Sequence, residues 1–360
     1  MRAQLPRLAA MLGLALAAVT WLVACNRGSL FPCKDIDHAC LSKAFTSHAV
    51  RTASFWADEL AKPRSARIGP APAALLEYLS LGNKLDGFSE RPRPAHLDAA
   101  FLADVQAAID EVPADMWRLA DSRLVGIYFM EQLGGSGYTE YVRDPDGKPT
   151  HAFVVLDSAV LSGLTANAWA TWKENTPFSI GGKASDTLTA TIAAPALDTR
   201  KSAIQYILLH ELTHVISVGR KVHPEWGNVV APPLPGEFPF FDLSWSVDTP
   251  KKAFATHFDA AWPQRRQVVY YLGAKLQPHE MVSAYAALDT TNFPTLYAVT
   301  NPADDFAESL VSYIHTVRMG KPWSITIQRA NEVVHTQQPC WQQARCAQKR
   351  KALEAILAGS

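Results

Sequence analysis

Apolar residues recur at helical spacing in three stretches of the N-terminal third of the chain. These stretches cover residues 40–61, 71–82 and 95–113, and Pro- and Arg-rich joints separate them. A repeat of three to four residues places apolar side chains on one face of a helix. We therefore predict a helical region that extends to about residue 120.

The apolar pattern changes its period after residue 122. Three segments are rich in β-branched and aromatic residues, and the turn sequences GGSG and DPDGKP separate them: residues 123–133, 137–144 and 150–160. Such segments, bounded by glycine, proline and aspartate, are typical of strands and tight turns. We predict a small antiparallel sheet between about Arg123 and Leu161, and residues 186–193 are a candidate for one further strand.

A long helix is predicted over residues 198–219, with Asp198 as its N-cap and Gly219 directly after its end. Residues 223–246 are rich in proline and aromatic residues and predict an irregular segment. Helical patterns then return in four stretches: residues 264–276, 279–288, 300–320 and 343–359. The expected fold class is α+β, with the sheet ahead of the long helix and a mostly helical C-terminal half.

The long helix contains the sequence HELTH inside an otherwise apolar run. His210 and His214 are one turn apart and project from one face, where both imidazoles can reach a single Zn²⁺. Glu211 is then placed to hold a zinc-bound water and to remove its proton. This arrangement explains why three titratable groups are tolerated in a buried helix, because polar side chains there need a metal or hydrogen-bond partners.

The charge composition of the chain argues against a nucleic-acid partner. The 360 residues contain 34 Lys and Arg and 34 Asp and Glu. A balanced chain offers no bulk attraction to phosphate backbones, so we expect no nucleic-acid partner.

The N-terminus has the pattern of an export signal. Two arginines precede a short apolar run that ends in the sequence LVAC, at Cys25. This resembles the lipobox of bacterial lipoproteins, which implies cleavage after residue 24, lipidation of Cys25 and a membrane contact through the lipid. The predicted location is the bacterial cell envelope, and Asn26 favours the outer membrane. A plain secretory signal and an uncleaved anchor are the alternatives.

The remaining cysteines form two close pairs, and their spacing agrees with export. Cys33 and Cys40 lie at one end of the mature chain, and Cys340 and Cys346 lie at the other. Disulfides are typical of oxidising compartments. Two local loops are the simplest pairing, and a bridge between the two ends is the alternative.

A second motif, LYAVTNPADDFAESLVSY, resembles the second zinc helix of the anthrax lethal-factor-like metallopeptidases and related zincins. The resemblance covers this motif and the HELTH helix. It implies that Asp304 is the third ligand of one zinc ion, that Glu308 supports the site from the next turn, and that Tyr297 assists the reaction. It also implies a substrate that pairs with an edge strand, for which residues 150–157 and 187–193 are the candidates.

This chain departs from the family at the third ligand, where glutamate is usual. Asp304 is one methylene shorter, so either its helix lies closer to the histidines or Glu308 is the ligand instead. His223 is a further alternative, because it follows soon after the HELTH helix. The apolar residues 229–241 either line a substrate pocket or pack in the core.

These observations predict four regions: a signal peptide (1–24), a lipidated and helical segment (25–120), the sheet with the HELTH helix (121–222) and a helical subdomain (223–360). The function implied is that of a zinc metalloendopeptidase acting on protein or peptide substrates. The alternative is a non-catalytic envelope lipoprotein, a scaffold or binding module that keeps a zincin fold.

Overall fold

The computed structural model describes residues 33–34, 37–179, 186–225 and 232–359. The predicted signal peptide and Cys25 lie outside these residues. Within the described part of the chain, none of the helices combines the length and the hydrophobicity needed to cross a membrane.

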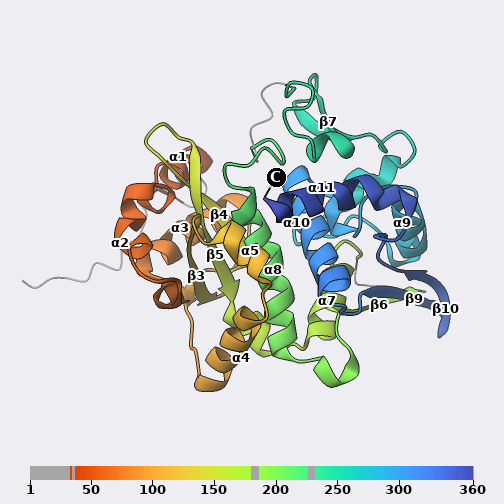
Figure 1. Cartoon of the computed structure of the whole chain (residues 1–360), viewed down its shortest axis with the longest axis horizontal. Helices are drawn as coiled ribbons and strands as arrows, with labels where there is room; N and C mark the ends of the chain where they lie inside the picture. The colour runs from red at the N-terminus through yellow and green to blue at the C-terminus, as the bar shows by residue number, and fades with distance from the viewer. Residues whose placement is uncertain (1–32, 35–36, 180–185, 226–231, 360) are drawn as a thin grey trace, which may run out of the picture.

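A mixed five-stranded sheet lies in the N-terminal half (Figure 1). Its strands run in the order β1–β3–β5–β4, and the short β2 also pairs with β3. Their bounds are β1 Ile68–Pro70, β2 Arg93–Pro94, β3 Leu124–Glu131, β4 Gly137–Arg143 and β5 Pro149–Asp157. The chain places the β4–β5 hairpin so that β5 lies between β4 and β3. As a result β5 runs parallel to β3, and the prediction of an antiparallel sheet was wrong in this respect.

Both faces of this sheet are covered by helices. One face, with Val125 and Phe153, packs against α3 (Ala73–Asp86) and Trp56. The other face packs against three helices: α4 Ala99–Asp110, α5 Ala114–Ala120 and α8 Arg200–Ser217. Near the N-terminus, the predicted helical stretch 40–61 is divided by 3₁₀ turns into α1 His38–Thr46 and α2 Ala57–Leu60.

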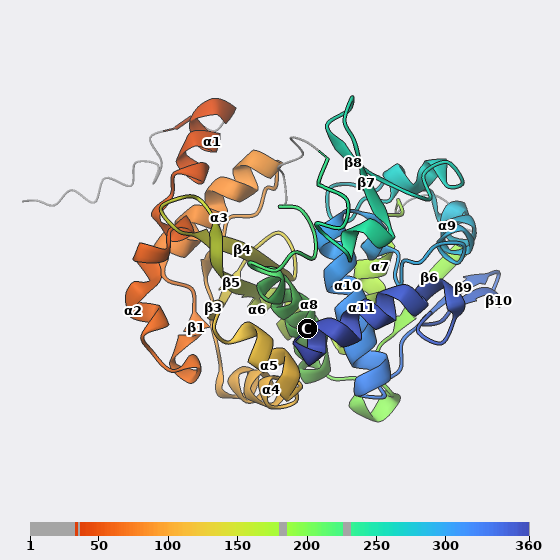
Figure 2. The ribbon, with the colours of Figure 1, turned by 45° about the horizontal axis from the view of Figure 1, so that its top comes forward.

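Helix α8 contains the HELTH sequence and lies at the centre of the molecule in both ribbon views (Figures 1 and 2). Every residue from 202 to 217 is buried. Its N-cap is Thr199, whose hydroxyl accepts from the Ser202 backbone N–H, and not the predicted Asp198. The Asp198 side chain instead accepts from the backbone N–H of Asn167. Gly219, with φ 67°, follows the helix end as predicted.

The C-terminal half packs against the other side of α8, mainly through α10 (Pro302–Tyr313). A π-helical turn, Ile314–Arg318, continues α10. Two further helices follow the large sheet, α6 Ser158–Ser162 and α7 Ala166–Asn175. The C-terminal half also contains α9 Met281–Leu288 and α11 Ala347–Ala358.

The C-terminal half is less helical than predicted, because two small antiparallel sheets lie within it or reach into it. One sheet has the order β10–β9–β6 and the other is the β7–β8 hairpin. Their bounds are β6 Asp186–Thr191, β7 Trp245–Asp248, β8 Ala253–Thr256, β9 Ser324–Arg329 and β10 Glu332–Gln337. The predicted helix at 264–276 is also wrong: only a 3₁₀ turn, Pro263–Gln267, forms there.

Two disulfides close local loops, as the simplest pairing predicted. Cys33 is bonded to Cys40, and Cys340 is bonded to Cys346. Both bridges are typical of proteins that fold in an oxidising, extracytoplasmic environment.

Candidate metal centre

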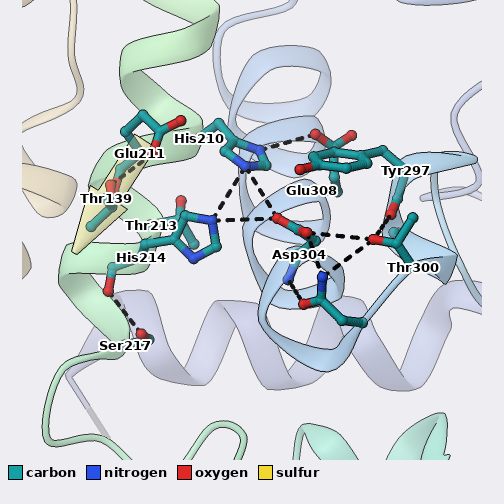
Figure 3. A network of polar contacts seen from close by, with 12 residues as sticks. Thr139, His210, Glu211, Thr213, His214, Ser217, Tyr297, Thr300, Asp304 and Glu308 are labelled. Atoms are coloured by element: carbon teal, nitrogen blue, oxygen red, sulfur yellow. Dashed lines mark hydrogen bonds and ion pairs between the residues drawn. The ribbon is translucent and has the colours of Figure 1, made fainter. Parts of the chain in front are cut away.

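Three side chains from two helices converge where α8 packs against α10. The Nε2 atoms of His210 and His214 lie 3.3 Å apart, and Asp304 Oδ1 lies 3.6 Å and 3.5 Å from them, respectively. All three residues are buried, and together they form a group able to hold a metal ion (Figure 3).

The separations between these three atoms fit a tetrahedral site. Ligands at 2.0–2.1 Å from a zinc ion define a tetrahedron whose edges are about 3.3–3.4 Å long. The observed separations of 3.3, 3.5 and 3.6 Å lie close to that value. Two imidazoles and one carboxylate are also a common ligand set of catalytic zinc.

Asp304 is oriented by the start of its own helix. Asn301 is the N-cap of α10, and its Oδ1 accepts from the Asp304 backbone N–H at 2.9 Å. The Asn301 side chain then donates from Nδ2 to Asp304 Oδ2 at 2.6 Å, and Thr300 contributes a longer bond of 3.4 Å to the same oxygen. These bonds direct the other oxygen, Oδ1, at the two histidines.

Glu308 contacts the site from behind His210. Its Oε1 accepts from His210 Nδ1 at 3.0 Å, while Thr295 donates to its Oε2 at 2.7 Å. A carboxylate on the outer nitrogen fixes the tautomer and the ring orientation of a ligating histidine. The structure therefore places Asp304 among the candidate ligands and Glu308 one layer further out.

The site is electrostatically suited to a cation. Burial alone would lower the pKa of His210, but hydrogen bonds to Asp304 and Glu308 outweigh it and raise that pKa to about 10. Burial favours a neutral Asp304, yet hydrogen bonds from His210 and His214 hold its pKa well below its usual range. Both shifts have one physical cause, the mutual stabilisation of a buried carboxylate and the histidines that donate hydrogen bonds to it.

Glu211 lies beside the candidate ligands and is held by strand β4. Thr139 donates from its hydroxyl to Glu211 Oε2 at 2.6 Å. The other oxygen, Oε1, approaches the backbone of Gly137 so closely that a Cβ atom built at that glycine would be 2.6 Å from it. The Glu211 carboxylate thus lies between the Thr139 hydroxyl and Gly137, where the absence of a side chain leaves room for it.

Tyr297 stacks on His210, with ring centroids 5.8 Å apart and planes inclined by 23°. Burial and the nearby Asp304 charge raise the pKa of its phenol well above the usual value. The phenol therefore stays protonated at neutral pH and is able to donate a hydrogen bond. Figure 3 shows its ring next to Glu308.

His223, the alternative ligand, does not belong to the candidate metal group. Its Nδ1 bonds the Pro224 carbonyl at 2.8 Å, and its buried Nε2 has no hydrogen-bond partner among the described residues. Burial lowers the pKa of this imidazole to about 4. His223 is a neutral core residue that packs near Phe306.

A cavity of about 550 Å³ opens beside these groups. Its walls are mainly aromatic and aliphatic, and they include residues from β4, α7 and α8 and from the segment after the 3₁₀ turn: Tyr138, Trp169, Tyr206, Ile207, Val268, Tyr270, Tyr271 and Leu272. His210, Glu211, Tyr297 and Asp304 reach the same cavity. The described part of the apolar segment, residues 232–241, contributes nothing to its lining; Phe240 and Phe241 pack in the core instead.

The edge strand next to the site is β4, not either of the two strands considered from the sequence. Strand β5 is paired on both sides, by β3 and β4. The outer edge of β6 is covered by α7. The Thr171 hydroxyl accepts from the backbone N–H of Ala190 in β6, and the Asn167 side chain accepts from that of Ile192, directly after the strand. Strand β4 ends the large sheet and borders the cavity at Gly137 and Tyr138.

Three supporting residues were not found from the sequence: Thr139, Lys173 and Thr295. Thr139 and Lys173 lie on elements distant from the two motifs, Thr295 directly precedes the second motif, and each touches a motif carboxylate. No element was predicted for the stretch that contains Lys173, so nothing in the sequence distinguished this lysine. Thr139 and Thr295 occur in no spacing that distinguishes them from other threonines.

Comparison with protein-family models, with curated proteins and with solved structures found no match to this chain.

Proposed function

We propose that this chain is a zinc-dependent metalloendopeptidase of the zincin type. The observation that carries the proposal is the convergence of His210, His214 and Asp304 at tetrahedral separations, with Glu211 beside them. His210, Glu211 and Asp304 line one cavity that is large enough for substrate side chains. A zinc ion in such a site acts as a Lewis acid that activates water and polarises carbonyl groups.

Each residue of the site then has a separate task. His210, His214 and Asp304 bind the ion, and Glu308 holds the His210 ring in place. Glu211 accepts a proton from the attacking water and delivers it to the leaving amine. Tyr297, a protonated phenol, donates a hydrogen bond to the developing oxyanion or to the leaving group.

The substrate that fits this geometry is an extended polypeptide. The outer edge of β4 carries backbone groups that a substrate strand can pair with, next to the cavity at Gly137. The aromatic walls of the cavity favour an apolar or aromatic side chain beside the cleaved bond.

The experiment that tests the activity compares the wild type with Glu211→Gln. We expect the wild-type protein to retain one zinc per chain after dialysis and to cleave denatured casein or a peptide library. The Glu211→Gln variant should retain the zinc and lose cleavage, because only the proton acceptor is removed.

Two outcomes would contradict the proposal in different ways. A wild-type protein that holds zinc but cleaves neither casein nor any library peptide would support the non-catalytic scaffold. A wild-type protein without zinc, under conditions in which it is folded, would refute the metal site itself.

The proposed location is the bacterial cell envelope, with Cys25 as the lipid-bearing residue. The two disulfides support export, and the sequence LVAC before residue 26 supports lipidation. Fractionation of wild type and Cys25→Ser tests this. A variant that stays in the membrane fraction with unchanged acyl labelling would refute the anchor.

A further inference from the structure

Lys173 is a buried lysine to which the proposed reaction assigns no task. It lies on α7 and is only 5% exposed. Its Nζ is 2.9 Å from Glu308 Oε1 and 3.5 Å from Glu174 Oε1. The ammonium also lies 4.6 Å from the centre of the Tyr297 ring. Buried lysines are rare and are paired where they occur, so this one has a definite electrostatic task.

On one side, Lys173 supports the candidate metal centre. The Glu308 oxygen that accepts from Lys173 is the same atom that accepts from His210 Nδ1, at 3.0 Å. Glu174 is also buried, and its Oε1 faces the same ammonium. Without the lysine, this oxygen would lose one of the two donors that hold it in place, and the carboxylate would orient the His210 ring less firmly.

On the other side, Glu174 holds the wall of the cavity. Its Oε2 accepts from the hydroxyls of Tyr270 and Tyr285, each at 2.8 Å. Tyr270 precedes Tyr271, and both residues line the cavity. Tyr271 has a φ of 65°, a left-handed conformation that a bulky residue adopts only when its surroundings impose it. The hydrogen bond from the Tyr270 hydroxyl to Glu174 anchors this segment one residue before Tyr271.

We propose that Lys173 and Glu174 are positioning residues that couple the orientation of His210 to the cavity wall at residues 268–272. The chain of contacts runs from His210 through Glu308, Lys173 and Glu174 to Tyr270. It joins the metal centre to a part of the cavity that would contact the substrate side chain. The inference rests on the proposed zinc site, but neither of its readouts needs peptide cleavage.

The test uses the double variant Lys173→Met/Glu174→Gln, which removes one positive and one negative charge together and so leaves the net charge of the buried cluster unchanged. Zinc affinity is measured by competition with a chromophoric chelator. The ligand geometry is followed by the visible spectrum of the Co²⁺-substituted protein, and hydrogen exchange reports on residues 268–272. We expect zinc affinity to fall by about 10–100-fold, the Co²⁺ spectrum to change and exchange in 268–272 to increase.

The matched control is Lys349→Met/Asp305→Asn, which removes another buried ion pair, between a lysine and an aspartate, on the next face of α10. This control loses a comparable interaction but should keep the zinc affinity, the Co²⁺ spectrum and the exchange of 268–272. A general loss of stability would change both variants alike, so the difference between them isolates positioning.

A single-hydroxyl variant tests the cavity side alone. Tyr270→Phe should increase exchange in residues 268–272 and leave zinc affinity within about twofold of wild type, because Lys173 and Glu308 are untouched. Tyr285→Phe removes the other hydroxyl on Glu174 and should affect that segment less, since Tyr285 does not line the cavity.

The coupling is overturned if the Lys173→Met/Glu174→Gln protein keeps either wild-type zinc affinity with an unchanged Co²⁺ spectrum or wild-type exchange in 268–272. A wild-type protein that binds no zinc would instead refute the proposed function. The two failures are thus distinguishable.

Discussion

Two neighbouring aspartates on α10 face opposite regions of the molecule. Asp304 points at the histidines of α8, and Asp305 points at Lys349 of α11 and at the indole N–H of Trp245. Both side chains are buried, yet their acidities move in opposite directions. The hydrogen bonds of the histidines hold the pKa of Asp304 far below its usual range, whereas burial raises the pKa of Asp305 despite the nearby lysine.

The difference shows that helical phase, not residue type, assigns the role of an acidic side chain here. Asp304 and Glu308 are four residues apart and share the face toward the metal centre. Asp305 and Ser309 share the next face, where Ser309 donates to Asp305 at 3.2 Å. One face of α10 builds the candidate metal centre, and the other attaches the C-terminal helix to the core.

The largest difference between the two faces should appear when each aspartate is replaced. Asp304→Ala removes a ligand, so zinc affinity should fall by more than about 100-fold. The loss of a residue that only supports a ligand typically lowers affinity by about 10–100-fold. Asp305→Asn should leave zinc affinity close to wild type. Chelator competition on both purified variants measures this, and equal zinc loss in the two would contradict the assignment of faces.

Substitutions on the face of α10 that carries Asp305 should lower the stability of the protein and leave metal binding unchanged. Lys349→Met leaves Asp305 buried without its cation, and breaking such a pair costs about 3–5 kcal/mol of unfolding free energy. Urea denaturation of the zinc-free protein measures the loss. Adding Asp305→Asn should recover part of it, because the uncompensated charge is then removed. An unchanged denaturation midpoint for Lys349→Met would show that this face carries no ion pair.

The π-helical end of α10 provides a third environment, with a histidine that is buried and neutral. His315 Nε2 bonds the Ile192 carbonyl at 2.9 Å, and burial lowers the pKa of the imidazole to about 4. The unfolded chain, with a pKa near 6.5, binds more protons than the folded one between these values. Stability should therefore decrease as the pH falls from about 6.5 to about 4, by at most about 3 kcal/mol from this residue.

The histidine is isolated by comparing the wild type with His315→Gln, which does not titrate. The midpoint of urea denaturation, measured at intervals between pH 4 and 7, should fall less steeply for the variant. Parallel curves for the two proteins would show that His315 is protonated equally in both states.

The smallest effect is expected for Glu308, which lies one turn from Asp304 on the same face of α10. Glu308→Gln keeps the size of the side chain but removes the charge that orients His210. Zinc affinity should fall by about 10–100-fold, less than for Asp304→Ala. The reverse order of the two losses would make Glu308 the ligand and Asp304 its support.

The sequence predicted the two halves of the candidate metal centre because each is encoded by spacing within one helix. HELTH places two imidazoles on one face of α8, and the motif around Asp304 places two carboxylates on one face of α10. Their convergence was inferred from a resemblance and not from spacing. The supporting contacts of Thr139 and Lys173 were not predictable, since they depend on how separate elements pack.

The fold was predicted less well where the local pattern has two interpretations. Strand β3 is buried along almost its whole length, and such continuous apolar runs are typical of parallel strands, a signal that the turn sequences outweighed. The β9–β10 hairpin turns through Ala330 and Asn331, which both have positive φ. Hairpin turns of this kind usually contain glycine, so little in the local residues indicated this one.

The close approach of Glu211 to Gly137 constrains how this chain can diverge in evolution. A methyl group at residue 137 would lie 2.6 Å from Glu211 Oε1 and 3.0 Å from Ile207 Cγ2, both ends of side chains, so the fold would accept it by displacing the carboxylate. Selection for folding alone would therefore let the glycine drift to alanine, whereas selection for a correctly placed carboxylate would not. In descendants that keep Glu211 under functional selection, we expect residue 137 to remain glycine, and its replacement to mark lineages in which the glutamate has lost its role.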